Sequence, residues 1–117
     1  MKTSSAKAKG RRLQQAVVED LRKLFNVDEG LDQYDGYIQC TNMGASGVDV
    51  KLAPNILEKF PFSIECKNVE KWSVPQWWKQ ASSNVKEGTS PLLIISKNRH
   101  KTLVVLEWDV FLNMLEE

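Results

Sequence analysis

The 117 residues have the composition of one ordinary globular domain, with 42% apolar and 26% charged residues, which is enough for one core but not for two. No stretch approaches the ~18 apolar residues of a membrane span, and the polar, basic beginning lacks the apolar segment of a secretory signal. Two cysteines, Cys40 and Cys66, are too few for a disulfide framework. The composition therefore excludes an integral membrane protein and favours a reducing, cytoplasmic compartment.

Charge is distributed unevenly along the chain. The formal net charge is +1, but residues 1–12 contain five cations and no acid, so the remainder carries −4. A basic segment on an acidic body favours a polyanionic partner, with the acids reserved for metal. A solubilising tail is the alternative. We expect residues 1–9 to form a flexible basic arm and residues 10–117 to form a single domain.

The first half of the chain predicts one helix and three strands. An apolar stripe at helical spacing marks the helix, and alternation of apolar and polar residues marks the second and third strands. Loops of small and polar residues separate these elements, and Pro54 breaks the second strand before a short connection. In chain order we expect a helix over about 11–25, a loop over 28–35, a strand over 37–40, a loop over 42–47, a strand around Asp49 and a strand over 62–67.

The second half predicts a helix, two strands and a last helix. Ser73 and Gln76 have the spacing of a capping box, and the apolar run 92–95 is typical of a strand buried on both faces. Asp109 fits the N-cap of the last helix. We expect a helix over 74–86, strands over 92–95 and 102–108, and a helix over 110–115. The order α-β-β-β-α-β-β-α predicts an α/β (mixed α+β) fold, with a central mixed sheet flanked by helices.

Asp49, Glu65 and Lys67 are the residues that best indicate a functional site. Because side chains of a strand alternate between faces, each of the two strands hides an apolar face and presents its acid on the other. If the strands are neighbours, two carboxylates and one ammonium share a small site. The alternative is a solvent-facing strand surface with an incidental ion pair.

This residue set fits a divalent metal with a catalytic lysine beside it. Mg²⁺ usually takes one or two protein carboxylates among its oxygen ligands. Asp49 and Glu65 supply two, and the backbone carbonyl of Cys66 can supply another oxygen. Such an ion lowers the pKa of a ligated water and stabilises charge on a scissile phosphate, and Lys67 can orient the water or neutralise that charge. Mn²⁺ is the expected substitute. No cluster suggests zinc, and no phosphate loop suggests a nucleotide cofactor.

The segments Gly47-Val48-Asp49 and Ile64-Glu65-Cys66-Lys67 together resemble the core motif of the PD-(D/E)XK nuclease superfamily. With Lys9-Gly10 at the start of the first helix and the Ser46-Gly47 loop, the chain is similar in particular to Holliday junction resolvases of archaeal type and their phage relatives. The resemblance covers about residues 9–108. It implies a restriction-endonuclease-like core, with Asp49, Glu65 and Lys67 as catalytic residues.

The resemblance also directs attention to two glutamines. Archaeal-type resolvases usually carry a Glu four residues after the Lys-Gly, where this chain has Gln14. At 100° per residue Gln14 falls within the apolar arc and Glu19 on the opposite side, so Gln14 is the expected inward polar residue; a Gln bonded to backbone is the alternative. A neutral amide adds no charge to a metal site. Related nucleases often place a Gln or Lys of the second helix at the active site, and Gln80 is the candidate here.

Candidate DNA contacts come from the basic arm, the small-residue loop, the second helix and a basic turn. Cations contact phosphates with a steep salt dependence, and Ser46 can bond a phosphate. Trp77 can stack on an exposed base, lie at a dimer interface or pack in the core. The candidates are Lys7, Lys9, Arg11, Arg12, Ser46, Trp77, Lys79, Lys97 and Arg99.

The resulting hypothesis is a Mg²⁺-dependent endonuclease of branched DNA, resembling a Holliday junction resolvase. A junction needs two matched cuts, so a homodimer is expected. If the chain is phage-encoded, it acts in the cytoplasm of the bacterial host. The alternatives are another nuclease of the superfamily, such as a nickase, flap or repair nuclease, and a non-catalytic DNA-binding module of the same fold, which Gln14 keeps open. A metabolic or scaffold protein with an accidental Glu-x-Lys is a further alternative.

Overall fold

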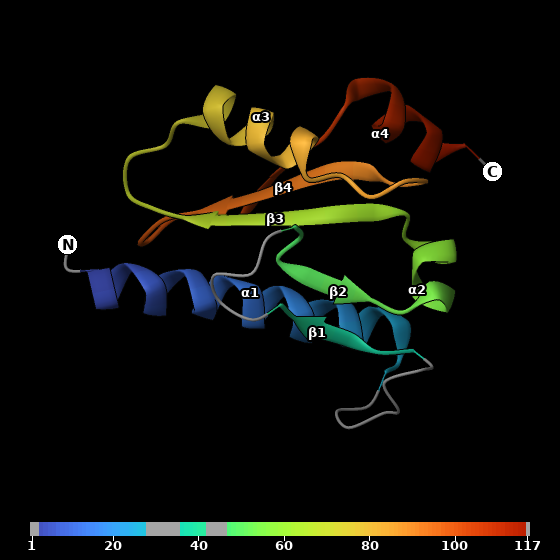
Figure 1. Cartoon of the computed structure of the whole chain (residues 1–117), viewed down its shortest axis with the longest axis horizontal. Coiled ribbons are helices and arrows are strands. Elements are labelled where there is room, and N and C mark those ends of the chain that lie inside the picture. Colours follow the sequence, from blue (N-terminus) through green and yellow to red (C-terminus); the bar gives the residue numbers. More distant parts are fainter. Residues whose placement is uncertain (1–2, 28–35, 42–46, 117) are drawn as a thin grey trace.

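The computed structural model describes residues 3–27, 36–41 and 47–116 of the chain. Figure 1 shows a sheet with α1 along one side and α3 along the other. None of the helices in these ranges is both long and apolar enough to cross a membrane. The elements are α1 (Thr3–Phe25), β1 (Ile38–Cys40), β2 (Val50–Leu52), α2 (Pro54–Lys59), β3 (Phe62–Asn68), α3 (Val74–Ser83), β4 (Ser90–Ser96), β5 (Leu103–Val105) and α4 (Trp108–Leu115).

The strands form two hydrogen-bonded groups. In the three-stranded sheet the order is β3-β4-β5, with β3 parallel to β4 and β4 antiparallel to β5. The other group is the antiparallel pair β1–β2; in Figure 1, β2 lies on the side toward β3 and β1 lies beside α1. The mixed sheet with flanking helices confirms the predicted α+β class, and it is compatible with the restriction-endonuclease-like core that the resemblance implies.

The central strand β4 is buried on both faces, as its continuous apolar run predicts. Leu92 and Ile94 belong to a core cluster with the apolar stripe of α1, whereas Leu93 and Ile95 belong to a second cluster with Ala81 of α3. Alternate residues of one strand therefore stabilise both layers of the fold. Because Glu65 pairs with Leu93 in the parallel register of β3 and β4, Glu65 faces the α3 layer.

The first helix begins eight residues earlier than predicted, at Thr3 instead of about Arg11. The added residues are rich in Ala and Lys, which are good helix formers, and Lys9 is buried at 3% exposure. A tertiary anchor therefore extends a helix that the apolar stripe alone does not mark. Residues 3–9 continue this helix here, and the division into a flexible arm and a domain from residue 10 stays a prediction.

Several smaller boundaries also differ from the prediction, and the strand expected over 102–108 ends at Val105. The connection after Pro54 is the short helix α2, because Pro is compatible with the first helical turn and Ile56 is buried at 3% exposure. The third helix ends at Ser83, three residues before the predicted Lys86. The last helix begins at Trp108 with Glu107 as N-cap, so Asp109 lies in the first turn instead of capping it.

Candidate active site

Asp49 lies immediately before β2 and is bonded to β3. Its backbone N–H donates to the carbonyl of Ile64 at 2.9 Å. Its Oδ2 then accepts the backbone N–H of Cys66 at 2.7 Å. The carboxylate thus takes the place of the next backbone acceptor, which satisfies a buried donor of β3 and fixes Asp49 beside Glu65.

Glu65 is held from the opposite side by α3. The side-chain amide of Gln80 donates to Glu65 Oε1 at 2.8 Å. Glu65 is only 4% exposed, and its Oε2 is buried without a hydrogen-bond partner among the described residues. Local sequence patterning thus places the acid on the inner face of β3, and α3 supplies the donor that orients it.

The electrostatics of the two carboxyls indicate a buried site in which Lys67 offsets only part of the cost of negative charge. Burial raises the pKa of Glu65 to about 7, with a further increase from the negative charge of Asp49 and smaller opposing effects of Lys67 and Asn84. Burial also raises the pKa of Asp49, against the Cys66 hydrogen bond and the Lys67 ammonium. Two buried acids, of which Asp49 further disfavours ionisation of Glu65, favour a bound cation.

The residues present fit one divalent cation. Glu65 Oε2 is a buried carboxyl oxygen without a hydrogen-bond partner among the described residues, and such a group needs a compensating charge when it is ionised. Among the described residues, no group of three or more His, Cys, Asp or Glu side chains gathers as a metal cage. Two carboxylates are nevertheless the usual protein share for Mg²⁺, which takes its other oxygens from water and phosphate. The ligand candidates are Asp49, Glu65 and the backbone carbonyl of Cys66.

Lys67 completes the cluster from the end of β3. It is two residues beyond Glu65 and half-buried, and its ammonium lowers the pKa of both carboxyls. Since this effect falls with distance, the structure brings Asp49, Glu65 and Lys67 together as their spacing in sequence predicts. The catalytic role of each remains a prediction.

Gln14 points inward from α1, whereas Glu19 is exposed on the other side of the helix. Gln14 is 9% exposed in the core-facing stripe, which agrees with the expected orientation. In the part of the chain that the structure describes, no hydrogen bond joins Gln14 to either carboxylate. Its place in the catalytic set therefore stays a prediction.

The candidate DNA contacts differ in accessibility. Trp77 and Lys97 are half-buried, and Lys9 is buried. Ser46 lies outside the described residues. The side chains exposed to solvent are those of Lys7, Arg11, Arg12, Lys79 and Arg99.

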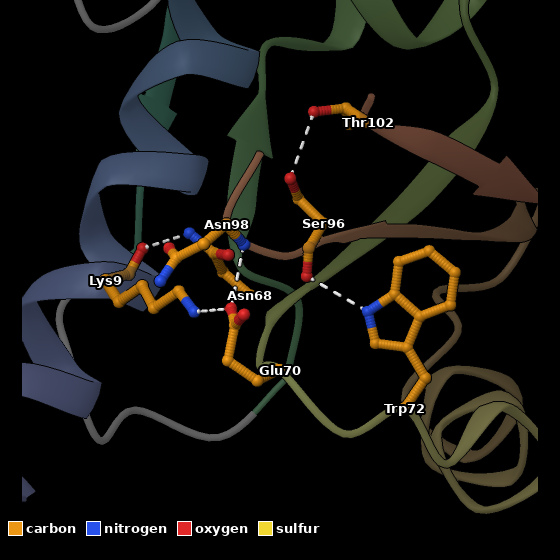
Figure 2. A network of polar contacts seen from close by, with 7 residues as sticks. All are labelled: Lys9, Asn68, Glu70, Trp72, Ser96, Asn98 and Thr102. Carbon is orange, nitrogen blue, oxygen red and sulfur yellow. Dashed lines mark hydrogen bonds and ion pairs between the residues drawn. The ribbon is translucent and has the colours of Figure 1, made fainter. Parts of the chain in front are cut away.

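Lys9 belongs to a polar network that the sequence did not reveal (Figure 2). Its ammonium forms an ion pair with Glu70 Oε2, which also accepts the backbone N–H of Asn98 at 2.8 Å. The side-chain amide of Asn68 donates to the Lys9 carbonyl at 2.9 Å. The network ties α1 to Asn68 at the end of β3, the residue that directly follows Lys67. Lys9 and Glu70 are 61 residues apart, so no local signal in the sequence marks the pair.

The basic turn after β4 packs on a neighbouring tryptophan. Trp72 donates its indole N–H to the carbonyl of Ser96 at 3.1 Å, as Figure 2 also shows. Lys97 Nζ lies 4.7 Å from the centroid of the Trp72 ring, and the ring centroids of Trp72 and His100 are 4.8 Å apart. Trp72 thus serves here as a support for the basic turn rather than as an exposed stacking platform.

One family profile matches nearly the whole chain. The family is described as "Phage putative PDDEXK endonuclease", and the match covers residues 5–117. This range contains Asp49, Glu65 and Lys67 together with Gln80. Searches of curated proteins and of solved structures give no significant match.

Proposed function

The chain belongs to the phage PDDEXK endonuclease family, and we propose that it is a Mg²⁺-dependent endonuclease that hydrolyses phosphodiester bonds in branched DNA. Family membership supports a nuclease of the PD-(D/E)XK superfamily, whose members generally use divalent metals, with DNA as the substrate. Selectivity for four-way junctions, in the manner of a Holliday junction resolvase, is the finer part of the proposal, as is action in the cytoplasm of a bacterial host.

The observation that carries the proposal is the unpartnered carboxylate oxygen of Glu65 beside Asp49. A purely structural pair of buried acids would be satisfied by internal donors or by a neighbouring cation. Here Gln80 occupies one oxygen of Glu65 and Cys66 N–H occupies one oxygen of Asp49. The remaining Glu65 oxygen is therefore open to an ion and the phosphate that would accompany it.

Each residue of the site has a distinct task in this proposal. A divalent cation at Asp49, Glu65 and the Cys66 carbonyl would supply Lewis-acid stabilisation of phosphate charge and acidify water. Lys67 neutralises charge that develops on the scissile phosphate. Gln80 holds the Glu65 carboxylate in one orientation. Gln14, the inward polar residue of α1, is assigned to the same set as a neutral residue that adds no charge.

DNA contacts outside the cluster are assigned to the exposed cations, with Lys79 on α3 and Arg99 in the basic turn. Lys7, Arg11 and Arg12 extend this set along α1. Such contacts to phosphates give affinity without sequence preference and weaken with salt. A homodimer would present two such sites for the paired cuts that a junction requires.

The first experiment compares cleavage of an end-labelled four-way junction with cleavage of matched linear duplex, flap and single-stranded DNA in the presence of Mg²⁺. We expect symmetric nicks near the crossover for the wild type and none for Asp49→Ala. Lys67→Ala is expected to bind the junction and leave it intact, because the lysine acts on the developing charge rather than on affinity.

The other outcomes assign other functions. Cleavage of linear or flapped DNA in preference to the junction would retain the nuclease and reject the resolvase. Tight junction binding without cleavage in Mg²⁺ or Mn²⁺ would reject the enzyme and favour a binding module. In that case Gln14→Glu tests whether the missing acid of the first helix restores activity.

A further inference from the structure

An apolar surface that takes no part in the site lies on β5 and α4. Seven large apolar side chains here are each 40–71% exposed. We call this surface the β5–α4 patch. Its members are Leu103, Val104, Trp108, Phe111, Leu112, Met114 and Leu115.

The patch borders a groove of about 330 Å³ that is lined almost entirely by apolar side chains. Its lining includes Val17 and Leu21 of α1 and Phe111 and Met114 of α4. Val104 of β5 also lines it. The patch is therefore concave next to its protruding helix, which is a shape suited to mutual insertion of side chains.

Helix α4 lacks a sufficient partner within the described chain. It has eight residues and none of them is buried. Isolated helices shorter than ~12–15 residues are marginal in water, and tertiary packing normally stabilises them. Of its side chains, Val110 packs partly on the main core, and Trp108 stacks on Phe111 with ring centroids 5.9 Å apart. The other apolar side chains of the helix remain exposed to solvent in the described chain.

The charge of the region argues against DNA as the partner that covers the exposed side chains of α4. Residues 103–116 contain Glu107, Asp109 and Glu116 and no Lys or Arg. Phosphate would be disfavoured there, whereas the exposed cations that we assign to DNA contacts lie on α1, α3 and the turn after β4. An exposed cation of α2, Lys59, lines a pocket with Val110 and Met114, but it is isolated from that basic set in sequence. The apolar patch and the proposed DNA-binding residues thus belong to different parts of the surface.

We propose that the β5–α4 patch is the interface of a homodimer. If a large apolar side chain offers about 150–250 Å², seven side chains that are 40–71% exposed provide roughly 550–950 Å² of apolar surface. A standard interface takes ~800 Å² from each partner. In addition, β5 pairs only with β4 in the described sheet. An open antiparallel edge is complementary to its own copy about a two-fold axis.

The dimer would serve the proposed function, because paired active sites suit the paired cuts of a junction. Only this purpose rests on the proposed function; the existence of the interface does not. Its existence is tested without DNA and without catalysis. Sedimentation velocity of the full chain, at micromolar concentrations and in high salt after nuclease treatment, excludes bridging by nucleic acid. We expect a dimer that persists in high salt, because apolar burial is not screened as charge pairs are.

Variants Val104→Glu and Met114→Glu place a charge in the patch at residues that are 56% and 55% exposed. Each should weaken dimerisation roughly 10-fold or more, because the charge would be desolvated in the interface. Leu24→Glu, at a residue of α1 that is 65% exposed, is the matched control and should remain dimeric. Circular dichroism verifies folding of all three variants.

A monomeric wild type would overturn the proposal, as would a dimer that both patch variants leave unchanged. Either result is independent of junction cleavage, so failure of this interface and failure of the proposed function are told apart. A dimer with no activity on DNA would support the interface and reject the enzyme.

Discussion

At the scale of single residues, the site depends on a few side chains that each satisfy one partner and leave one atom open. Asp49 accepts the Cys66 N–H, and Glu65 accepts the Gln80 amide, while Glu65 Oε2 has no partner in the described structure. The result is a rigid pair of acids whose free oxygen is directed by its neighbours. Rigidity of this kind is what positions a metal ligand within tolerance.

The orienting role of Gln80 leads to a first prediction. Gln80→Ala removes the hydrogen bond to Glu65 and should lower the cleavage rate by about 10–100-fold, since such supporting partners usually contribute this much to metal affinity or activity. Excess divalent metal should recover part of the loss. Single-turnover cleavage as a function of metal concentration measures both effects.

Ser82→Ala, an exposed substitution on the same helix, is the control for that experiment and should retain the wild-type rate. Equal rates for wild type and Gln80→Ala at every metal concentration would contradict the orienting role. An unfolded Gln80→Ala is recognised by circular dichroism and is not expected, because Gln80 is largely exposed apart from this bond.

At the scale of elements, the long helix α1 is held at two levels. Its second half buries an apolar stripe against the sheet, and its first half is tied by Lys9 to Asn68 and Glu70. The polar tie explains why helix continues through residues that show no apolar periodicity. It also couples the position of α1 to the end of β3, which carries Lys67.

Two glycines predict opposite responses to the same substitution. Gly10 lies inside α1, and an added Cβ would meet no atom within 4 Å. Gly10→Ala should therefore raise the free energy of unfolding by about 0.5–1 kcal/mol. Gly47, near Asp49, has a φ of +98°. Gly47→Ala should lower the free energy of unfolding by about 1–2 kcal/mol, because an L side chain is strained there. Urea denaturation compares both variants; stabilisation by both, or by neither, would contradict this account.

The tie between α1 and β3 predicts a specific pH dependence. The Asn98 N–H and the Lys9 ammonium lower the pKa of Glu70 from its ordinary value of 4.5. A carboxyl with a lowered pKa stabilises the fold above its unfolded pKa, and this stability is lost as pH falls through the folded pKa. Glu70→Gln should therefore melt below the wild type at neutral pH, and the difference should shrink below about pH 4.5.

Thermal melts from pH 7 to pH 3 measure this difference, and Glu58→Gln on α2 serves as the control at another exposed acid. The effect is small in absolute size, because the Glu70 side chain is 49% exposed and solvent screens the pair. A constant difference between wild type and Glu70→Gln over the whole range would contradict the role of the charge.

At the scale of the whole molecule, the two faces of the sheet are used differently. The α3 layer contains Glu65 with Gln80, whereas the α1 layer contains the larger apolar core and borders the groove beside α4. The proposed active site and the proposed dimer interface thus occupy separate surfaces of one small fold. This separation lets each be altered by mutation without the other.

Metal binding should stabilise the whole fold. An ion that binds only the folded chain adds about 2.7 kcal/mol at a hundred times its dissociation constant, which for a domain of this size raises the melting temperature by roughly 10 °C. We expect this shift with Mg²⁺ or Mn²⁺ for the wild type and not for Asp49→Ala or Glu65→Ala. Differential scanning fluorimetry against a chelator measures it, and an unchanged wild-type melt at high metal would contradict the metal site.

Features that depend on local periodicity can be predicted from the amino-acid sequence of this chain. The alternation around Glu65 set which face of β3 carries the acid, the apolar run of β4 predicted burial on both faces, and the motif of Asp49 with Glu65 and Lys67 indicated the family. These features follow from backbone geometry with a period of 2 or 3.6 residues, so neighbouring residues contain the information.

Contacts between distant segments could not be predicted in this way and are known only from the folded structure. The pairing of Lys9 with Glu70, the hydrogen bond from Gln80 to Glu65, and the exposure of α4 depend on how finished elements pack. The apolar residues of α4 would have the same spacing in the sequence whether this chain or a second copy covered them. Packing over long sequence separations selects among such alternatives, because the free energy of burial depends on area and not on position in the chain.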